Sequence, residues 1–443
     1  MWLEYFSQYM ETVFPRFLSE RPWNYKNDLC VTGAAFLADI TGNPRWNRYI
    51  LDAGKWLVDE DGGVANWKED ENNIDKVSFG KSLRILRDLT GDGRYGRGVE
   101  KAYAFLEHYP RTATGNFWHK DIYPNQVWLD GLYMAMHFYA KCLAENGEDR
   151  WDDIMDQFQS THCLLWNEKT GLYLHGCDVS RKADWADPVT GRSSGVWLRA
   201  EGWFLMALAD VYGLAKDYTP RAEELVLLLK NGLDGLLQYQ DRESHMFLQV
   251  VDHADLPGNY PETSGSAMTA YALMKGARLG MLGDSYWDKG NEVLEGIRRT
   301  WLKKEEDGWH LHGICASAGL GAGPDPHNRK DRNGTPEYYI SEAQMTDNQH
   351  GAAACMMAVS EQLRRKGNHS CSHLDCASMT QKSCPLKNLS PLCGKKLKKA
   401  ERKSRERASK LILYIYSRIC YNTNKQLKLP VAKMGLFFEN SIL

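Results

Sequence analysis

Four turns decide the fold of this chain: Thr41-Gly-Asn-Pro-Arg-Trp46, Thr90-Gly-Asp-Gly-Arg-Tyr95, Asn146-Gly-Glu-Asp-Arg-Trp151 and Leu282-Gly-Asp-Ser-Tyr-Trp287. In each turn a glycine can adopt the left-handed conformation that ends a helix. A polar side chain soon after it can accept backbone N–H bonds at the start of the next helix. We therefore expect each turn to join the two helices of a hairpin. The turns recur about every 50–70 residues, so six hairpins would fill the chain up to about residue 366.

Apolar residues recur at the helical spacing of i, i+3, i+4 and i+7 in twelve spans. These spans are 2–19, 28–41, 45–59, 79–90, 95–108, 127–145, 150–161, 197–214, 219–238, 264–281, 285–302 and 341–365. Strand patterns are few and short, such as those within 171–175 and 245–251, and both of these fall in connections between helices. Twelve helices paired as hairpins can close into two concentric rings, so the sequence predicts an all-α (α/α)6 toroid with a pocket at one face. An open superhelix is the alternative, and the irregular, aromatic-rich connections favour closure.

The last 77 residues differ from the rest of the chain. Residues 367–443 contain 15 Lys and Arg against 4 Asp and Glu, and all 15 tryptophans lie at or before Trp309. No helical period persists in this segment. We expect an (α/α)6 domain over residues 1–366 and a disordered or non-native tail over residues 367–443.

Charge and hydropathy exclude two classes of partner. Residues 1–366 carry 40 Lys and Arg against 53 Asp and Glu, and nucleic-acid affinity depends on clustered basic residues, so we expect no nucleic acid. No apolar run approaches the about 20 residues that cross a bilayer, so we expect no membrane partner. The N-terminal stretch from Met1 to Phe6 lacks the basic start and continuous apolar run of a secretion signal, which predicts a cytoplasmic location.

Two carboxylates are candidates for proton chemistry. Asp130 lies in Trp128-Leu-Asp-Gly-Leu-Tyr-Met134, where apolar neighbours at a helix start would raise its pKa towards the range useful for proton transfer. Asp75, in Asn72-Asn-Ile-Asp-Lys76, also precedes a helix. Either residue could instead be a simple helix cap. Two carboxylates from neighbouring inner helices suit acid–base work on a sugar, which favours the catalytic interpretation.

Candidate binding residues lie on a helix and in two loops. Arg199 and Trp203 are four residues apart, on one helix face, and an Arg fork with a Trp ring suits an acidic sugar. An Arg packed over a core Trp would give the same pattern. His119 and His175 lie in loops beside aromatic residues, where a histidine is often structural. Neither has the spacing of a metal site, so we expect no metal.

These residues belong to a wider set of motifs that resembles glycoside hydrolase family 105, the unsaturated rhamnogalacturonyl hydrolases. The motifs are His119-Lys120, Tyr123-Pro124, Trp128–Met134, Arg199-Ala-Glu-Gly-Trp203, Glu262-Thr-Ser-Gly-Ser266 and Gly313–Gly321. The resemblance covers about residues 20–365 and implies an (α/α)6 toroid that removes a 4,5-unsaturated galacturonyl unit from pectin fragments, without any cofactor. Two departures are Glu201, where the family usually has Asn, and Asp28, where a Gly is common; they bear on fine substrate preference.

The resemblance also implies roles for individual residues. Asp130 matches the catalytic acid and base, which would protonate C4 of the vinyl ether and then activate water for attack at C5. Residues placed around the unsaturated uronate are Asp75, His119, Trp128, His175, Arg199, Trp203 and Tyr25. Two alternatives stay open: an unsaturated glucuronyl hydrolase acting on glycosaminoglycan-like fragments, and a non-catalytic toroid that binds acidic sugars.

Overall fold

The computed structural model describes residues 1–68, 70–322 and 332–367. Within these ranges the chain is mostly helical. The predicted tail over 367–443 lies, apart from its first residue, outside the described residues. No helix in the described ranges combines the length and apolar composition needed to cross a bilayer.

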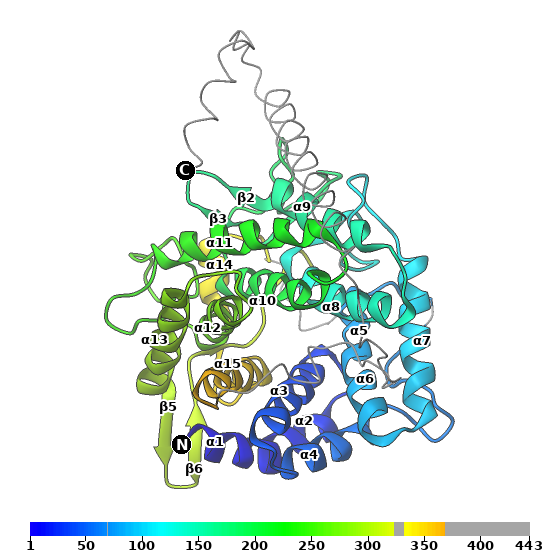
Figure 1. Ribbon diagram of the computed structural model, residues 1–443. Coiled ribbons are helices and arrows are strands. Elements are labelled where there is room, and N and C mark those ends of the chain that lie inside the picture. Colours follow the sequence, from blue (N-terminus) through cyan, green and yellow to red (C-terminus); the bar gives the residue numbers. More distant parts are fainter. Residues whose placement is uncertain (69, 323–331, 368–443) are drawn as a thin grey trace, which may run out of the picture. The chain divides into compact units, whose positions relative to one another are not determined.

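Six helices form a closed inner ring (Figure 1). They are α3 (Tyr25–Thr41), α6 (Phe79–Thr90), α8 (Leu129–Asn146), α10 (Leu198–Ala215), α12 (Thr263–Arg278) and α15 (Gln349–Gly367). Helix α15 packs against α3, so the last helix of the ring meets the first. A Cβ at Gly33 of α3 would lie 2.9 Å from Cβ of Met356 in α15, so this contact requires a glycine. The ring is therefore closed by backbone approach, which excludes the open superhelix.

The outer helices alternate with the inner ones along the chain. They are α1 (Trp2–Gln8) with a π-helical turn (Tyr9–Val13) and α2 (Phe14–Glu20), then α4 (Arg45–Gly54), α7 (Gly93–Glu107), α9 (Trp151–Leu165), α11 (Glu223–Leu237) and α13 (Asp284–Trp301). Each packs against one or more helices of the inner ring. With α1, the π turn and α2 taken as one helical segment, all twelve predicted helices form and confirm the (α/α)6 toroid.

The left-handed glycine forms in three of the four quoted turns, and a polar side chain accepts an N–H bond at the next helix start in the first two of them, from Asn43 and Asp92, but not before α9. Gly42, Gly91 and Gly147 have φ of 62°, 67° and 66° and end α3, α6 and α8. The fourth prediction is wrong, because Gly283 has an extended conformation before α13, and the left-handed glycine after α12 is Gly280, with φ of 77°. The hairpin still forms, because a glycine lies close to the helix end in either case.

Short antiparallel strands occupy the connections. They pair as β1 (Gln126–Trp128) with β4 (Gly176–Asp178), β2 (Trp166–Asn167) with β3 (Leu172–Tyr173), β5 (Leu302–Glu305) with β6 (Gly308–Leu311), and β7 (Ile314–Cys315) with β8 (Gln344–Met345). The strand predicted within 171–175 is confirmed by β3, whereas 245–251 forms only isolated bridges. Two short helices, α5 (Ile74–Val77) and α14 (Pro336–Ser341), complete the elements that carry the site; a 3-10 turn (Pro220–Ala222) precedes α11.

Candidate active site

Asp130 lies in the first turn of α8, directly after β1. Trp128 is the residue at the helix cap, so the interpretation of Asp130 as a cap is wrong. Pairing of β1 with β4 aligns Trp128 with Gly176, and this register places His175 beside Asp130. His175 Nε2 lies 3.3 Å from Asp130 Oδ2, within ion-pair distance, and neither atom makes a hydrogen bond within the described residues. The Asp130 side chain is 14% exposed and that of His175 is fully buried.

The pKa of Asp130 differs from the sequence-based prediction. Burial raises this pKa, as expected, but the adjacent imidazoles of His175 and His119 lower it by more. The net shift is downward, so the predicted rise is wrong. In the free protein Asp130 is therefore a carboxylate at neutral pH, poised to accept a hydrogen bond from His175.

Asp75 comes from α5, the short helix that bridges α6 and α8. The cap of α5 is Asn73, whose side chain accepts from the Asp75 N–H, so Asp75 is not a cap either. Its carboxylate pairs with Lys120, whose Nζ lies 2.7 Å from Oδ2, and it faces His119, whose Nε2 lies 3.9 Å from Oδ1. Burial lowers the pKa of Lys120, and the Asp75 charge more than offsets this. Asp75 thus lies in a charged pair at the site.

His119 lies between the two carboxylates and stacks on Trp128. The two rings are 4.1 Å apart at a 17° angle, and Tyr123 stacks on Trp128 at 4.8 Å. Burial lowers the pKa of His119 to about 4, although the Asp75 and Asp130 charges oppose the shift. The imidazole is therefore neutral at neutral pH. The structure brings His119 into contact with Trp128 and places it 3.9 Å from Asp75.

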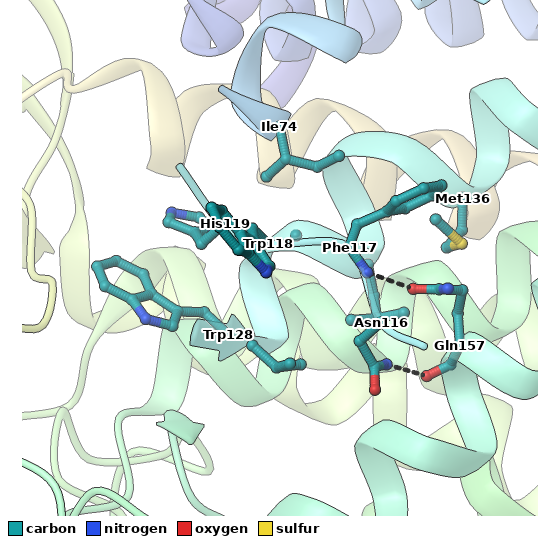
Figure 2. A pocket seen from close by; sticks show the side chains of 11 residues that line it. Ile74, Asn116, Phe117, Trp118, His119, Trp128, Met136 and Gln157 are labelled. Atoms are coloured by element: carbon teal, nitrogen blue, oxygen red, sulfur yellow. Dashed lines mark hydrogen bonds between the residues drawn. The ribbon is translucent and has the colours of Figure 1, made fainter. Parts of the chain in front are cut away.

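A small cavity lies behind these rings (Figure 2). His119, Trp118 and Trp128 line it, and Gln157 holds its wall by accepting from Phe117 N and from the amide of Asn116. Its volume of about 10 Å³ admits about one water molecule. A sugar ring cannot enter this cavity, so a sugar must approach His119 and Trp128 from another side.

Arg199 is a buried cation with unused hydrogen-bond donors. Its Nη1 donates to Ser264 Oγ at 3.0 Å and to the Cys315 carbonyl at 2.7 Å, while Nε and Nη2 have no partner among the described residues. The side chain is 1% exposed, and no carboxylate in the described ranges lies within ion-pair distance of it. The guanidinium lies over Trp197, 4.8 Å from the ring centroid, rather than over Trp203. Such a group is ready to receive an anion in fork geometry.

Tyr25 links the charged groups of the site. Its hydroxyl lies 2.9 Å from His350 Nε2. Burial raises the pKa of Tyr25 above its ordinary value, Asp75 and Asp130 raise it further, and Arg199 opposes them. Asp75, Asp130 and Arg199 therefore all lie close enough to the Tyr25 hydroxyl to influence it electrostatically.

Trp203 lies beneath Tyr25. It is 1% exposed, packs on Tyr133 at 4.8 Å and meets the edge of Tyr25 at 6.4 Å. In the free protein Trp203 therefore packs against Tyr25 and Tyr133, and its ring face is not exposed to solvent for stacking on a sugar.

Three residues outside the sequence-based predictions join the site: Lys120, Tyr339 and His350. Lys120 directly follows His119, so its position in that motif could have identified it as a site residue. Tyr339 lies on α14 and its hydroxyl is 2.8 Å from His175 Nδ1. His350 lies in the first turn of α15, and burial, followed by the charges of Arg199 and Lys26, holds its pKa well below the ordinary value. No local sequence pattern identifies Tyr339 or His350 as site residues, because only the closure of the helix ring brings them near His175 and Tyr25.

The two departures from the family pattern both contact protein groups. Glu201 is fully buried, accepts from the Tyr173 N–H at 2.5 Å, and has no partner for Oε2 among the described residues. Burial raises its pKa to about 8. Asp28 accepts from Trp23, Ser78 and Ser82, and burial raises its pKa to about 7 against these bonds. In the free protein both carboxyls thus bond to neighbouring protein segments.

Comparison with known proteins places this geometry in a family. The model of Glycosyl Hydrolase Family 88 matches residues 3–366. A family 105 glycoside hydrolase of C. acetobutylicum is similar in structure, with 36% identity, a TM-score of 0.75, and coverage of 81% of this chain and 99% of that one. The chain belongs to the glycoside hydrolases of families 88 and 105.

Two further relatives show how far the likeness extends. The 24.9 kDa protein in the picA locus of Rhizobium radiobacter is 38% identical over 217 residues, which cover 48% of this chain and 90% of that protein. An unsaturated glucuronyl hydrolase of Bacillus sp. GL1, responsible for the degradation of glycosaminoglycan, shares the fold at 13% identity, with a TM-score of 0.57 and coverage of 83% of this chain and 97% of that one.

Proposed function

We propose that this glycoside hydrolase removes the 4,5-unsaturated galacturonyl unit from rhamnogalacturonan oligosaccharides by hydration of the C4=C5 bond. The observation that carries the proposal is the state of Arg199. A buried guanidinium with two free N–H donors and no acidic partner in the described ranges is costly unless a ligand supplies the anion. A uronate carboxylate has the matching geometry, because its two oxygens accept two parallel N–H bonds.

The proton chemistry is assigned to Asp130. Protonated Asp130 donates to C4, the positive charge that develops at C5 is attacked by water, and the resulting hemiketal opens and releases the rest of the oligosaccharide. The Asp130 carboxylate then takes the proton of the attacking water. Asp75, charge-paired with Lys120, provides negative potential that favours the cationic centre.

The lowered pKa of Asp130 fits this role once the substrate is bound. A bound uronate brings a negative charge and displaces water, and both effects raise the pKa of a nearby carboxyl. Asp130 is therefore a carboxylate in the free protein and becomes an acid in the complex.

The test is to mix the purified protein with lyase-digested rhamnogalacturonan and follow loss of the ultraviolet absorbance of the C4=C5 bond. Undigested polysaccharide, which lacks that bond, is the control. We expect loss of absorbance with the digest only, and release of a single monosaccharide, the 4-deoxy-5-keto uronate that hydration of the unsaturated galacturonyl unit produces.

Two other results would replace the proposal. Faster loss with a lyase-digested glycosaminoglycan would make the protein an unsaturated glucuronyl hydrolase. Binding of either digest by calorimetry, without any loss of absorbance, would make it a non-catalytic toroid that binds acidic sugars.

A further inference from the structure

Tyr339 lies behind His175, on the side of the ring away from Asp130. Its hydroxyl is 2.8 Å from His175 Nδ1, and the ring planes are tilted by 46° with centroids 5.8 Å apart. The phenol is fully buried and packs parallel to Trp197 at 6.0 Å. Its position is fixed further by its backbone carbonyl, which accepts from Gln249. Tyr339 is therefore held rigidly at one nitrogen of the His175 ring.

The two contacts of His175 define where its proton lies. Asp130 is a carboxylate in the free protein and can only accept hydrogen bonds, so the nitrogen that faces it, Nε2, carries the hydrogen. With its one hydrogen on Nε2, the ring has a lone pair on Nδ1, which lies 2.8 Å from the Tyr339 hydroxyl and can accept its O–H. Burial raises the pKa of Tyr339 well above its ordinary value, so the phenol keeps the proton that it donates.

With Tyr339 donating to Nδ1 and Nε2–H directed at Asp130, the His175 tautomer determines which oxygen of Asp130 can carry the catalytic proton. Oδ2 is buried and faces the His175 N–H, so a proton added to Asp130 must take Oδ1. With the opposite tautomer, Nε2 would be an acceptor and would draw the proton of Asp130 onto Oδ2, between the two side chains. A proton held there cannot reach a substrate carbon.

We propose that Tyr339 is a positioning residue, which fixes the His175 tautomer and thereby directs the acidic proton of Asp130 to Oδ1. The proposal rests on the proposed function for its kinetic consequence, although the tautomer itself does not. Tyr339 touches neither Asp130 nor the reacting atoms in this role and acts only through His175.

The first measurement uses the full chain with ¹⁵N-labelled histidine and reads the two ring nitrogen shifts of His175, assigned by their loss in His175→Gln. We expect the Nε2–H tautomer in the wild-type protein, and growth of the Nδ1–H tautomer in Tyr339→Phe. Tyr338→Phe is the matched control, because it removes a hydroxyl from the same short helix, where it accepts from Gly319 N. We expect the control to keep the wild-type tautomer.

The second measurement is turnover on the lyase digest. Tyr339→Phe should lower kcat at least about tenfold, since a misplaced proton removes general acid catalysis, with KM within about twofold because no substrate contact is lost. The Nδ1–H tautomer in the wild-type protein, or an unchanged tautomer and kcat in a folded Tyr339→Phe, would overturn the proposal. If the wild-type protein turned over no substrate, the proposed function would fail, and the wild-type spectrum would still decide the tautomer.

Discussion

The buried carboxyl of Glu201 should make the free energy of unfolding of this protein depend on pH. Burial raises its pKa to about 8 from an ordinary value of 4.5. Between these two pH values the folded protein holds a proton that the unfolded chain releases, so the free energy of unfolding falls as the pH rises. The loss begins near pH 4.5 and is complete near pH 8. A shift of about 3.5 pKa units at about 1.4 kcal/mol each corresponds to a few kcal/mol.

The perturbation that removes this dependence is Glu201→Gln. Gln keeps the size of the side chain and the acceptor for the Tyr173 N–H, but it cannot ionise. From pH 5 to pH 8 the free energy of unfolding of the wild-type protein should fall by about 3 to 4 kcal/mol relative to that of the variant. The variant should therefore be the more stable protein at pH 8, and should lose most of that advantage at pH 5.

The assay is urea unfolding at pH 5, 6, 7 and 8, followed by far-ultraviolet circular dichroism and by tryptophan fluorescence. Glu243→Gln, at an exposed turn, controls for the loss of one negative charge. The reasoning would be refuted by a stability difference between the wild-type protein and Glu201→Gln that stays constant across this range, because Glu201 would then be ionised in both states.

Three other changes test the site and the domain boundary. Asp130→Asn should lower turnover about 10²–10⁴-fold with binding nearly intact, as measured by absorbance and calorimetry; near-wild-type turnover would move the proton donor to Asp75. Arg199→Ala should raise KM much more than it lowers kcat in steady-state kinetics, and a collapse of kcat at unchanged KM would contradict the uronate clamp. Truncation after Lys366 should leave the melting temperature and turnover unchanged; a large loss of either would place the boundary elsewhere.

The helices could be predicted from sequence because their signals are local. Apolar spacing and turn glycines lie within a few residues of the elements that they define, and all twelve helices formed. The predicted strand over 245–251 failed for a long-range reason. The N–H groups of Phe247, Gln249 and Val250 bond to Ser266 Oγ, the Tyr260 carbonyl and Asn259 Oδ1, so no partner strand is needed.

The site could be predicted only in part, because its residues come from separate turns of the toroid. Asp130, Arg199 and Trp203 were found from residues beside them on their own helices. The partners that set the pKa of Asp130 and hold His175 come from distant segments. His175 reaches Asp130 through the register of β1 with β4, and Tyr339 arrives from α14. Residue spacing in the sequence contains no information on such long-range pairs. This is why the predicted rise in the pKa of Asp130 was wrong.

Asp130 and Glu201 together show that burial alone does not decide the protonation of a carboxyl in this toroid. Both lie in the first turn of an inner helix, α8 or α10, and burial raises the pKa of each. Glu201 has a single backbone N–H as partner and remains protonated up to about pH 8. Asp130 faces an imidazole that lowers its pKa. A proton donor with such a partner must gain its proton when the ligand arrives, and an anionic ligand held by Arg199 supplies the charge that favours this step. Under the proposed function, the requirement for an acidic substrate therefore comes from Asp130 as well as from Arg199.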